Sequence, residues 1–222
     1  MKRLHRRSAA QQTANACLVL LCVAEMTAAH AWSLTVNSGQ RRLYLHVGDG
    51  AVSGTANGST GNLNGTQGTS GIVNTVEVSV PFAQLGNGTA LQMSSDSSQS
   101  VSRLGDGNVT CPTPASQVMV GAGFRRNSGN ASATLTVVSP ANLINASGDT
   151  IPIDQISWTV SAPGSPVPNV IAGGTFNGGS LLLATVPGNT YYENCHTFSY
   201  ANSAVRAAGT YNGRVTYTLA AP

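Results

Sequence analysis

The sequence predicts an all-β protein, a sandwich of two antiparallel sheets with seven to nine short strands. Glycine is abundant and charged residues make up only 9% of the chain, a composition that disfavours helices because Gly, Ser, Thr and Asn stabilise them poorly. Apolar and polar residues alternate with a period of two, which is typical of half-buried strands. The clearest alternation places five residues on one face of the last strand: Tyr211, Gly213, Val215, Tyr217 and Leu219. Short strands separated by Gly, Pro and Asn turns favour a two-sheet sandwich.

The first 31 residues have the layout of a secretory signal peptide. Basic residues near the start precede an apolar run at residues 16–24, and the small residues Ala29 and Ala31 flank His30 just before Trp32. The run is far shorter than the roughly 20 residues that a membrane span requires. We therefore expect cleavage after Ala31, no membrane span, and one domain at residues 32–222 in the periplasm, at the cell surface or outside the cell.

Removal of this segment makes the chain neutral. Four of the eleven basic residues and one of the eight acidic residues lie in it, which leaves seven of each, and Lys2 is the only lysine. Nucleic acids and anionic lipids are bound by clustered basic charge. The remaining doublets, Arg41 with Arg42 and Arg125 with Arg126, read more simply as strand-end charges that keep sheet edges soluble. We expect no nucleic-acid partner.

Two of the four cysteines also leave with the signal, and Cys111 and Cys195 remain. Two cysteines in an exported chain predict one disulfide. A catalytic or metal-binding thiol is the alternative, but the chain has no CxxC motif and no further cysteine to complete such a site. Closing a loop of about 85 residues would stabilise the fold by roughly 4 kcal/mol on the chain-entropy model.

The remaining strands follow from the same alternation. We expect them at residues 41–47, 75–80, 118–120, 133–137, 156–161, 181–186, 192–200 and 210–219. Two stretches break the pattern. Residues 48–71 are almost wholly Gly, Ser, Asn, Thr and Ala, and they predict a mobile loop or a poorly ordered hairpin. Residues 162–169 form a Pro-rich connection that cannot lie inside a central strand.

Residues that could perform catalysis are sparse. The processed chain keeps two histidines, His46 and His196, with no HExxH spacing and no Gly-x-Ser-x-Gly elbow around a nucleophile. Asp149 and Asp154 flank a short apolar segment without the spacing of an EF-hand, and acidic residues at turns usually cap backbone amides. We therefore expect neither enzymatic activity nor a metal ion or cofactor.

Aromatic residues gather in the last 32 residues of the chain and could form a platform for a sugar. Most of them fall on apolar strand faces, where core packing is the simpler explanation. The doublet of Tyr191 and Tyr192 is different, because neighbouring residues of a strand point to opposite faces. One of these two rings is the best candidate for a surface contact, for example with a glycan.

The segments Gly148-Asp-Thr-Ile-Pro-Ile-Asp-Gln-Ile-Ser-Trp158 and Gly209-Thr-Tyr-Asn-Gly-Arg-Val-Thr-Tyr-Thr-Leu219 carry a resemblance to a known family. The second resembles the final strand of bacterial fimbrial subunits exported for chaperone–usher assembly, and the related spore-coat-U-like secreted domains end in a similar way. The first resembles a strand start found in small exported bacterial proteins. The resemblance implies an incomplete immunoglobulin-like sandwich whose missing strand comes from a like subunit, while a periplasmic chaperone binds the open edge beforehand.

The predicted mature chain begins with a candidate donor strand. Trp32, Leu34 and Val36 alternate directly after the cleavage site. This spacing suits a strand donated to another subunit, and it suits equally a first strand paired within its own sandwich. We expect an exported, non-enzymatic structural or adhesive surface protein that acts through strand pairing. The alternative is a self-contained secreted module that binds a glycan or a component of the cell envelope.

Overall fold

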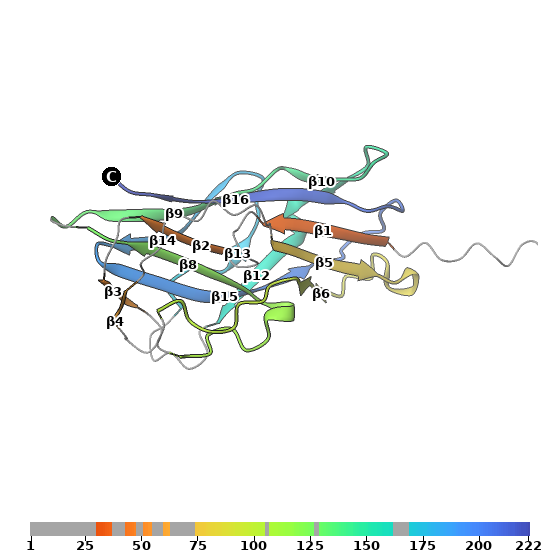
Figure 1. The fold of residues 1–222 in the computed structure, drawn as a ribbon. Helices are drawn as coiled ribbons and strands as arrows, with labels where there is room; N and C mark the ends of the chain where they lie inside the picture. Colours follow the sequence, from red (N-terminus) through yellow and green to blue (C-terminus); the bar gives the residue numbers. More distant parts are fainter. Residues whose placement is uncertain are drawn as a thin grey trace, which may run out of the picture.

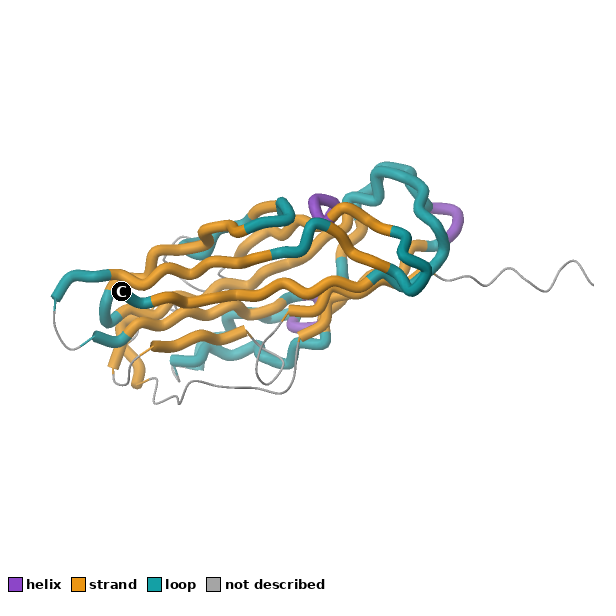
Figure 2. Tube along the Cα trace, turned by 90° about the horizontal axis from the view of Figure 1, so that it is seen from above, coloured by secondary structure: helices purple, strands orange, loops and turns teal. Residues whose placement is uncertain are grey.

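A computed structural model of the chain describes residues 30–36, 43–47, 51–54, 60–62, 74–104, 107–126, 129–161 and 169–222. The protein is all-β, with two mainly antiparallel sheets whose strands run lengthwise (Figures 1 and 2). Among the described residues the helical elements are single 3-10 turns: η2 (Phe82–Gln84), η3 (Pro114–Ser116) and η4 (Ile153–Gln155). No helix in this part of the chain has the length and apolarity needed to cross a membrane.

The first sheet brings together strands from both ends of the chain. Its strands are β1 (His30–Val36), β5 (Asn74–Val80), β7 (Ser94–Ser95), β9 (Ser132–Val138), β10 (Asn142–Ile144), β11 (Thr150–Pro152), β14 (Ser180–Pro187) and β16 (Asn212–Ala220). The last strand, β16, pairs with β9 over its second half and with β1 over its first half. On its other side β1 pairs with β5 along seven residues, so β1 lies inside the sheet (Figure 1).

The second sheet is arranged around one long strand, β15. It contains β2 (Leu43–Val47), β3 (Ala51–Gly54), β4 (Thr60–Asn62), β6 (Leu91–Gln92), β8 (Val118–Phe124), β12 (Ile156–Ser161), β13 (Gly174–Thr175) and β15 (Thr190–Tyr200). The first five residues of β15 pair with β8 and the last six pair with β12. On the opposite edges, β3 pairs with the start of β15 and β6 with its end, and β8 in turn pairs with β2.

Side chains from both sheets meet in one hydrophobic core. The alternation in the sequence provides the apolar side chains of this core, since every second residue of a strand faces the same side of the sheet. In β9 the residues Ala133, Leu135 and Val137 are fully buried, while Thr134 and Val138 between and beside them are exposed. The same cluster includes Trp158 and Phe198 from the second sheet. The faces that the alternation predicts to be buried are therefore the faces that form the core.

Several expectations need correction in detail. The described residues form sixteen strands where seven to nine were expected, mainly because short two- and three-residue pairings add to the long strands. Three pairings are parallel: β1 with β16, β2 with β8 and β3 with β15. Residues 48–71, predicted as a mobile loop or a poorly ordered hairpin, contain an antiparallel pair, β3 and β4, and the rest of this stretch lies outside the described residues.

The proposed signal segment is almost entirely outside the described residues. His30 and Ala31 are the exception, since they are the first two positions of β1 and oppose Val80 and Ser79 of β5. Cleavage after Ala31 would leave the pairing from Trp32 onward in place. The signal peptide and the boundary at Ala31 remain predictions.

Candidate functional site

The first candidate site is the position of β1 between two strands that are distant in sequence. The register opposes Trp32 to Val78 and Leu34 to Val76 in the antiparallel pairing with β5. On the other side, the parallel pairing opposes Leu34 to Gly213 of β16. The three residues predicted to form a donor strand, Trp32, Leu34 and Val36, are thus all part of a paired strand.

The strands that border β1 present apolar positions to the core. Val76 and Val80 of β5 and Val215 of β16 are buried, and Val78 is half-buried. These positions of β5 oppose alternate residues of β1, including Leu34. If β1 left, two rows of backbone N–H and C=O groups, on β5 and on β16, would lose their partners. Such a gap is a strong site for another strand.

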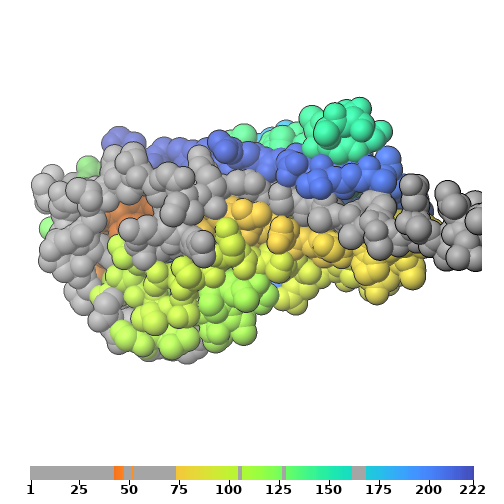
Figure 3. All heavy atoms as spheres, turned by 45° about the vertical axis from the view of Figure 1, so that its right-hand side comes forward, coloured from red at the N-terminus to blue at the C-terminus, as the bar shows by residue number. Residues whose placement is uncertain are grey.

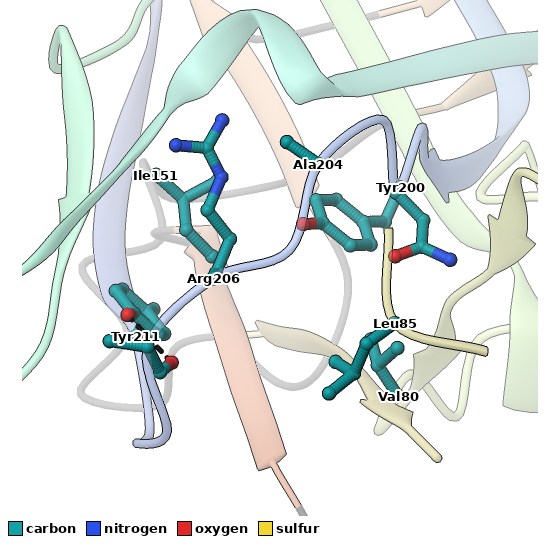
Figure 4. Close-up of a pocket in the computed structure, with 9 residues that line it drawn as sticks. Val80, Leu85, Ile151, Tyr200, Ala204, Arg206 and Tyr211 are labelled. Carbon is teal, nitrogen blue, oxygen red and sulfur yellow. Dashed lines mark hydrogen bonds between the residues drawn. The ribbon is translucent and has the colours of Figure 1, made fainter. Parts of the chain in front are cut away.

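A small hollow, open to solvent, lies at the end of the molecule where β1 begins. Its lining is mainly apolar and aromatic: Val80, Leu85, Ile151, Tyr200, Asn202, Ala204, Arg206, Ala207 and Tyr211. Figure 4 shows β1 passing between Tyr211 on one side and Val80 and Leu85 on the other. The hollow therefore lies beside the start of β1, where His30 opposes Val80.

Two phenols beside the hollow are held in their neutral form. Burial raises the pKa of Tyr200, and the nearby Arg206, which shares a hydrogen bond with it, acts in the opposite direction. Burial raises the pKa of Tyr211 too, and the negative charge of Asp149 adds to the increase. The Tyr211 hydroxyl donates a hydrogen bond to the carbonyl of Ala207, 2.9 Å away. These contacts fix the wall of the hollow, and they offer no activated nucleophile.

Asn202 anchors the turn that forms another wall of this hollow. Its buried side chain accepts a hydrogen bond from the Gly86 N–H (2.9 Å) and donates to the carbonyl of Gln84 (2.7 Å) and to Oδ1 of Asn87 (3.1 Å). Its backbone has a φ of 51°, a left-handed conformation that Asn tolerates better than most residues. Sequence reasoning missed this residue, because one Asn in an Asn-rich chain gives no distinct signal.

The predicted disulfide between Cys111 and Cys195 is confirmed. The sulfurs are 2.05 Å apart, the Cα atoms are 5.5 Å apart, and both residues are fully buried. Met119 of β8 packs against the bridge. The bond connects the segment before β8 to the middle of β15, so it ties a surface segment to the second sheet.

The expectation that one ring of the tyrosine doublet reaches the surface is wrong for Tyr191, which is 0% exposed. Tyr192 is half-buried and packs on the main core. The two rings do point to opposite faces of β15. The face that carries Tyr191 is covered, because Leu104 and Val52 pack on this ring in a second, smaller cluster.

A buried carboxylate lies in this second cluster and was not singled out in the sequence. Glu193 is 1% exposed and accepts three hydrogen bonds: from the hydroxyl of Tyr191 (2.7 Å), Oγ1 of Thr110 (2.5 Å) and the backbone N–H of Arg103 (3.2 Å). Burial, followed by the charge of Glu193, raises the pKa of Tyr191 well above its usual value. The alternation in β15 places Glu193 on the same face of the strand as Tyr191. That face is buried because a segment that includes Arg103, Leu104 and Thr110 covers it.

The ring of Tyr191 fits there because residue 121 is a glycine. A Cβ on Gly121 would lie 2.5 Å from the Tyr191 hydroxyl, closer than nonbonded atoms approach. Gly121 is also the β8 residue opposed to Glu193 in the sheet. The pairing of β8 with β15 therefore leaves the space in which the Tyr191 hydroxyl binds Glu193.

The histidines do not form a catalytic pair. His196 is fully buried between the rings of Trp158 and Phe198, each with its centroid 6.2 Å away, and burial lowers its pKa to about 3. His46 is on β2 beside Tyr44, with ring centroids 6.2 Å apart. Within the part of the chain that the structure describes, no group of three His, Cys, Asp or Glu residues is placed to hold a metal ion.

Neither a protein-family model nor a curated protein matches this chain.

Proposed function

We propose that this chain is an exported, non-enzymatic surface protein that assembles through strand pairing, in the manner of a fimbrial subunit. The observation that carries the proposal is the place of β1, a strand near the beginning of the chain that lies between β5 and β16. A strand in this place can be contributed by the chain itself or by another copy, since both supply the same residues in the same register.

Three features support the proposal. The sheet positions that flank β1 bury valines on the core side, so the site demands an apolar, alternating strand. Two sheets packed on a common core fit the immunoglobulin-like sandwich that the resemblance to fimbrial subunits implies. The disulfide fits a protein that matures in an oxidising compartment. In this proposal the periplasm or the cell surface is the site of assembly, and like subunits and a periplasmic chaperone are the partners.

A second candidate is a self-contained secreted module that binds a glycan or a component of the cell envelope. The specific observation in its favour is that β1 pairs with β5 along its full length within the same chain. A sheet completed in this way needs no partner strand. Binding would then use the surface loops and the half-buried Tyr192.

Exchange of β1 between copies can be trapped with a designed disulfide. Ser33 opposes Glu77 of β5 in the antiparallel register. Opposed Cα atoms in such a pair are about 4.5–5.5 Å apart, within the range of about 4.4–6.8 Å that a disulfide spans. We would mix exported protein that carries Ser33→Cys with exported protein that carries Glu77→Cys. The proposal predicts covalent dimers of one copy of each.

Thr218→Cys provides the matched control. Thr218 is also exposed on the first sheet, but it opposes Thr136 of β9 and has no pairing with β1. Dimers should form with Glu77→Cys far more than with Thr218→Cys. Equal yields from the two mixtures would reject strand exchange. If the double variant Ser33→Cys/Glu77→Cys closes only within single monomers, the self-contained module is the better account.

A further inference from the structure

The outer side of the second sheet is covered by a segment of the chain that we name the strap, residues 97–104 and 107–111. Figure 3 shows the lime-coloured atoms of this region forming a continuous stretch of the surface. Beneath it, Tyr191, Glu193 and Cys195 of β15 are each at most 1% exposed. These side chains alternate along one face of the strand, and the same face of an uncovered sheet would be open to water.

The strap has its own internal hydrogen bonds. Val101 and Val109 form an antiparallel bridge, the Ser102 N–H donates to the carbonyl of Asn108 (2.8 Å), and the Cys111 N–H donates to the carbonyl of Ser100 (3.0 Å). A segment that satisfies backbone groups within itself can move away from the sheet with little loss of backbone pairing.

The described contacts between the strap and the sheet are of four kinds. One is the polar contact with Glu193, which accepts hydrogen bonds from Thr110 and from the backbone of Arg103. A second is the small apolar contact of Leu104 with Tyr191. The third is the guanidinium of Arg103, which lies over the ring of Tyr44 in β2, 4.8 Å from its centroid. The fourth is the covalent bond between Cys111, at the end of the strap, and Cys195.

We infer that the strap is an oxidation-controlled cover: it is closed when Cys111 and Cys195 are bonded, and it opens when they are reduced, while the two sheets stay folded. The few contacts to the sheet and the internal pairing of the strap carry this inference. Opening exposes the Glu193 carboxylate and the Tyr191 phenol, which are otherwise sealed inside the protein.

The chemical step is a thiol–disulfide exchange with a dithiol reductant. A thiolate of the reductant attacks one sulfur of the bond, and the other cysteine leaves as a thiolate. The second thiol of the reductant then displaces the first cysteine and closes a disulfide within the reductant. Two electrons and two protons pass to the protein, which leaves Cys111 and Cys195 as thiols. Both cysteines are fully buried in the closed state, so the reductant reaches the bond when the strap opens transiently, and reduction then keeps it open.

Trypsin provides a direct test, because the predicted mature chain has no lysine and Arg103 is the one arginine in the strap. Arg214 lies in β16 within the first sheet, so its cleavage reports unfolding of the sheets. We would compare the exported oxidised protein, the same protein after treatment with a dithiol, and the double variant Cys111→Ala/Cys195→Ala. Mass spectrometry gives the rate at each arginine, and the fluorescence of the buried Trp158, in a Trp32→Phe background, reports the core.

We expect cleavage at Arg103 to rise at least tenfold when the disulfide is absent, with cleavage at Arg214 and the Trp158 signal unchanged. Unaltered cleavage at Arg103 would show that the strap stays closed without the bond. Parallel increases at Arg103 and Arg214 with loss of the Trp158 signal would show that the bond holds the whole domain. Either result would overturn the inference. The dithiol-treated wild-type protein gives the same readout if the double variant does not accumulate.

Discussion

His196 shows at the scale of one residue how burial makes the fold sensitive to acid. Its ring is stacked in the core, and both of its nitrogens are buried without a hydrogen-bond partner among the described residues. With its pKa lowered to about 3, it stays neutral in the folded protein at pH values where an unfolded chain binds a proton. The stability that follows from this difference is fully present above pH 6.5 and is lost as the pH falls toward 3.

The variant His196→Leu should therefore lose less stability in acid than the wild-type protein. At pH 5 the wild-type loss from this residue is about 2 kcal/mol, because each pH unit below the ordinary histidine pKa of about 6.5 corresponds to about 1.4 kcal/mol. Urea unfolding of both proteins at pH 7 and pH 5 measures the difference. Carboxylates contribute equally to both proteins, so identical losses in the two proteins would contradict the prediction.

Tyr191 illustrates which residue properties can be predicted from the sequence. The alternation in β15 correctly predicts that Tyr191 and Tyr192 point to opposite faces, and the cysteine count correctly predicts the bond between Cys111 and Cys195. Alternation describes one strand at a time. It contains no information about a distant segment such as Leu104 that covers one of the faces. The buried state of Glu193 was missed for the same reason.

At the scale of elements, the turn at residues 81–88 depends on one side chain from another part of the chain. Asn202→Ala removes three side-chain hydrogen bonds, to Gly86, Gln84 and Asn87. The substitution should lower the free energy of unfolding by about 2–3 kcal/mol. A buried hydrogen bond contributes about 1 kcal/mol, and the backbone groups that lose their partner stay buried. Urea unfolding measures this change, and hydrogen exchange at the Gly86 amide locates it.

Asn177→Ala is the matched control for this turn. Asn177 is exposed and accepts one hydrogen bond, from the Gly179 N–H (2.9 Å), so its replacement should change stability by less than about 0.5 kcal/mol. A similar loss in the two variants would show that Asn202 has no special role in holding the turn.

The strand positions were predictable, whereas part of the strand pairing was not. Period-two patterns located β5, β9, β12 and β16 to within one or two residues. The parallel pairing of β1 with β16 joins Ser33 to Asn212, far apart in the sequence, and no local pattern encodes such a partner. From the sequence, β1 could pair within its own chain or be donated to another copy. The structure contains the pairing within the chain, and exchange between copies stays a prediction.

At the scale of the whole molecule, the buried phenols make the fold sensitive to alkali. Burial raises the pKa of Tyr191, Tyr200, Tyr211 and Tyr217. Below pH about 10 these phenols are neutral in both the folded and the unfolded states. As the pH rises further, the unfolded chain ionises first, so the free energy of unfolding falls.

We therefore expect Tyr191 and Tyr217, the two phenols whose pKa burial raises most, to ionise together with unfolding at a pH above about 10. Near-ultraviolet absorbance follows the phenolates, and circular dichroism follows the sheets during the same titration. The rise in phenolate absorbance should coincide with the loss of sheet signal. Ionisation of all six tyrosines at pH about 10 in a protein with intact sheets would contradict this prediction.

The parallel alignment of β1 and β16 determines how the molecule carries mechanical load. Tension applied at the first residue of β1 and the last residue of β16 draws the two neighbours lengthwise past each other. The evenly spaced hydrogen bonds between the two strands then bear the force at the same time, and they do not break one after another. A filament or surface layer that transmits pull through these two ends would be loaded in its most resistant direction.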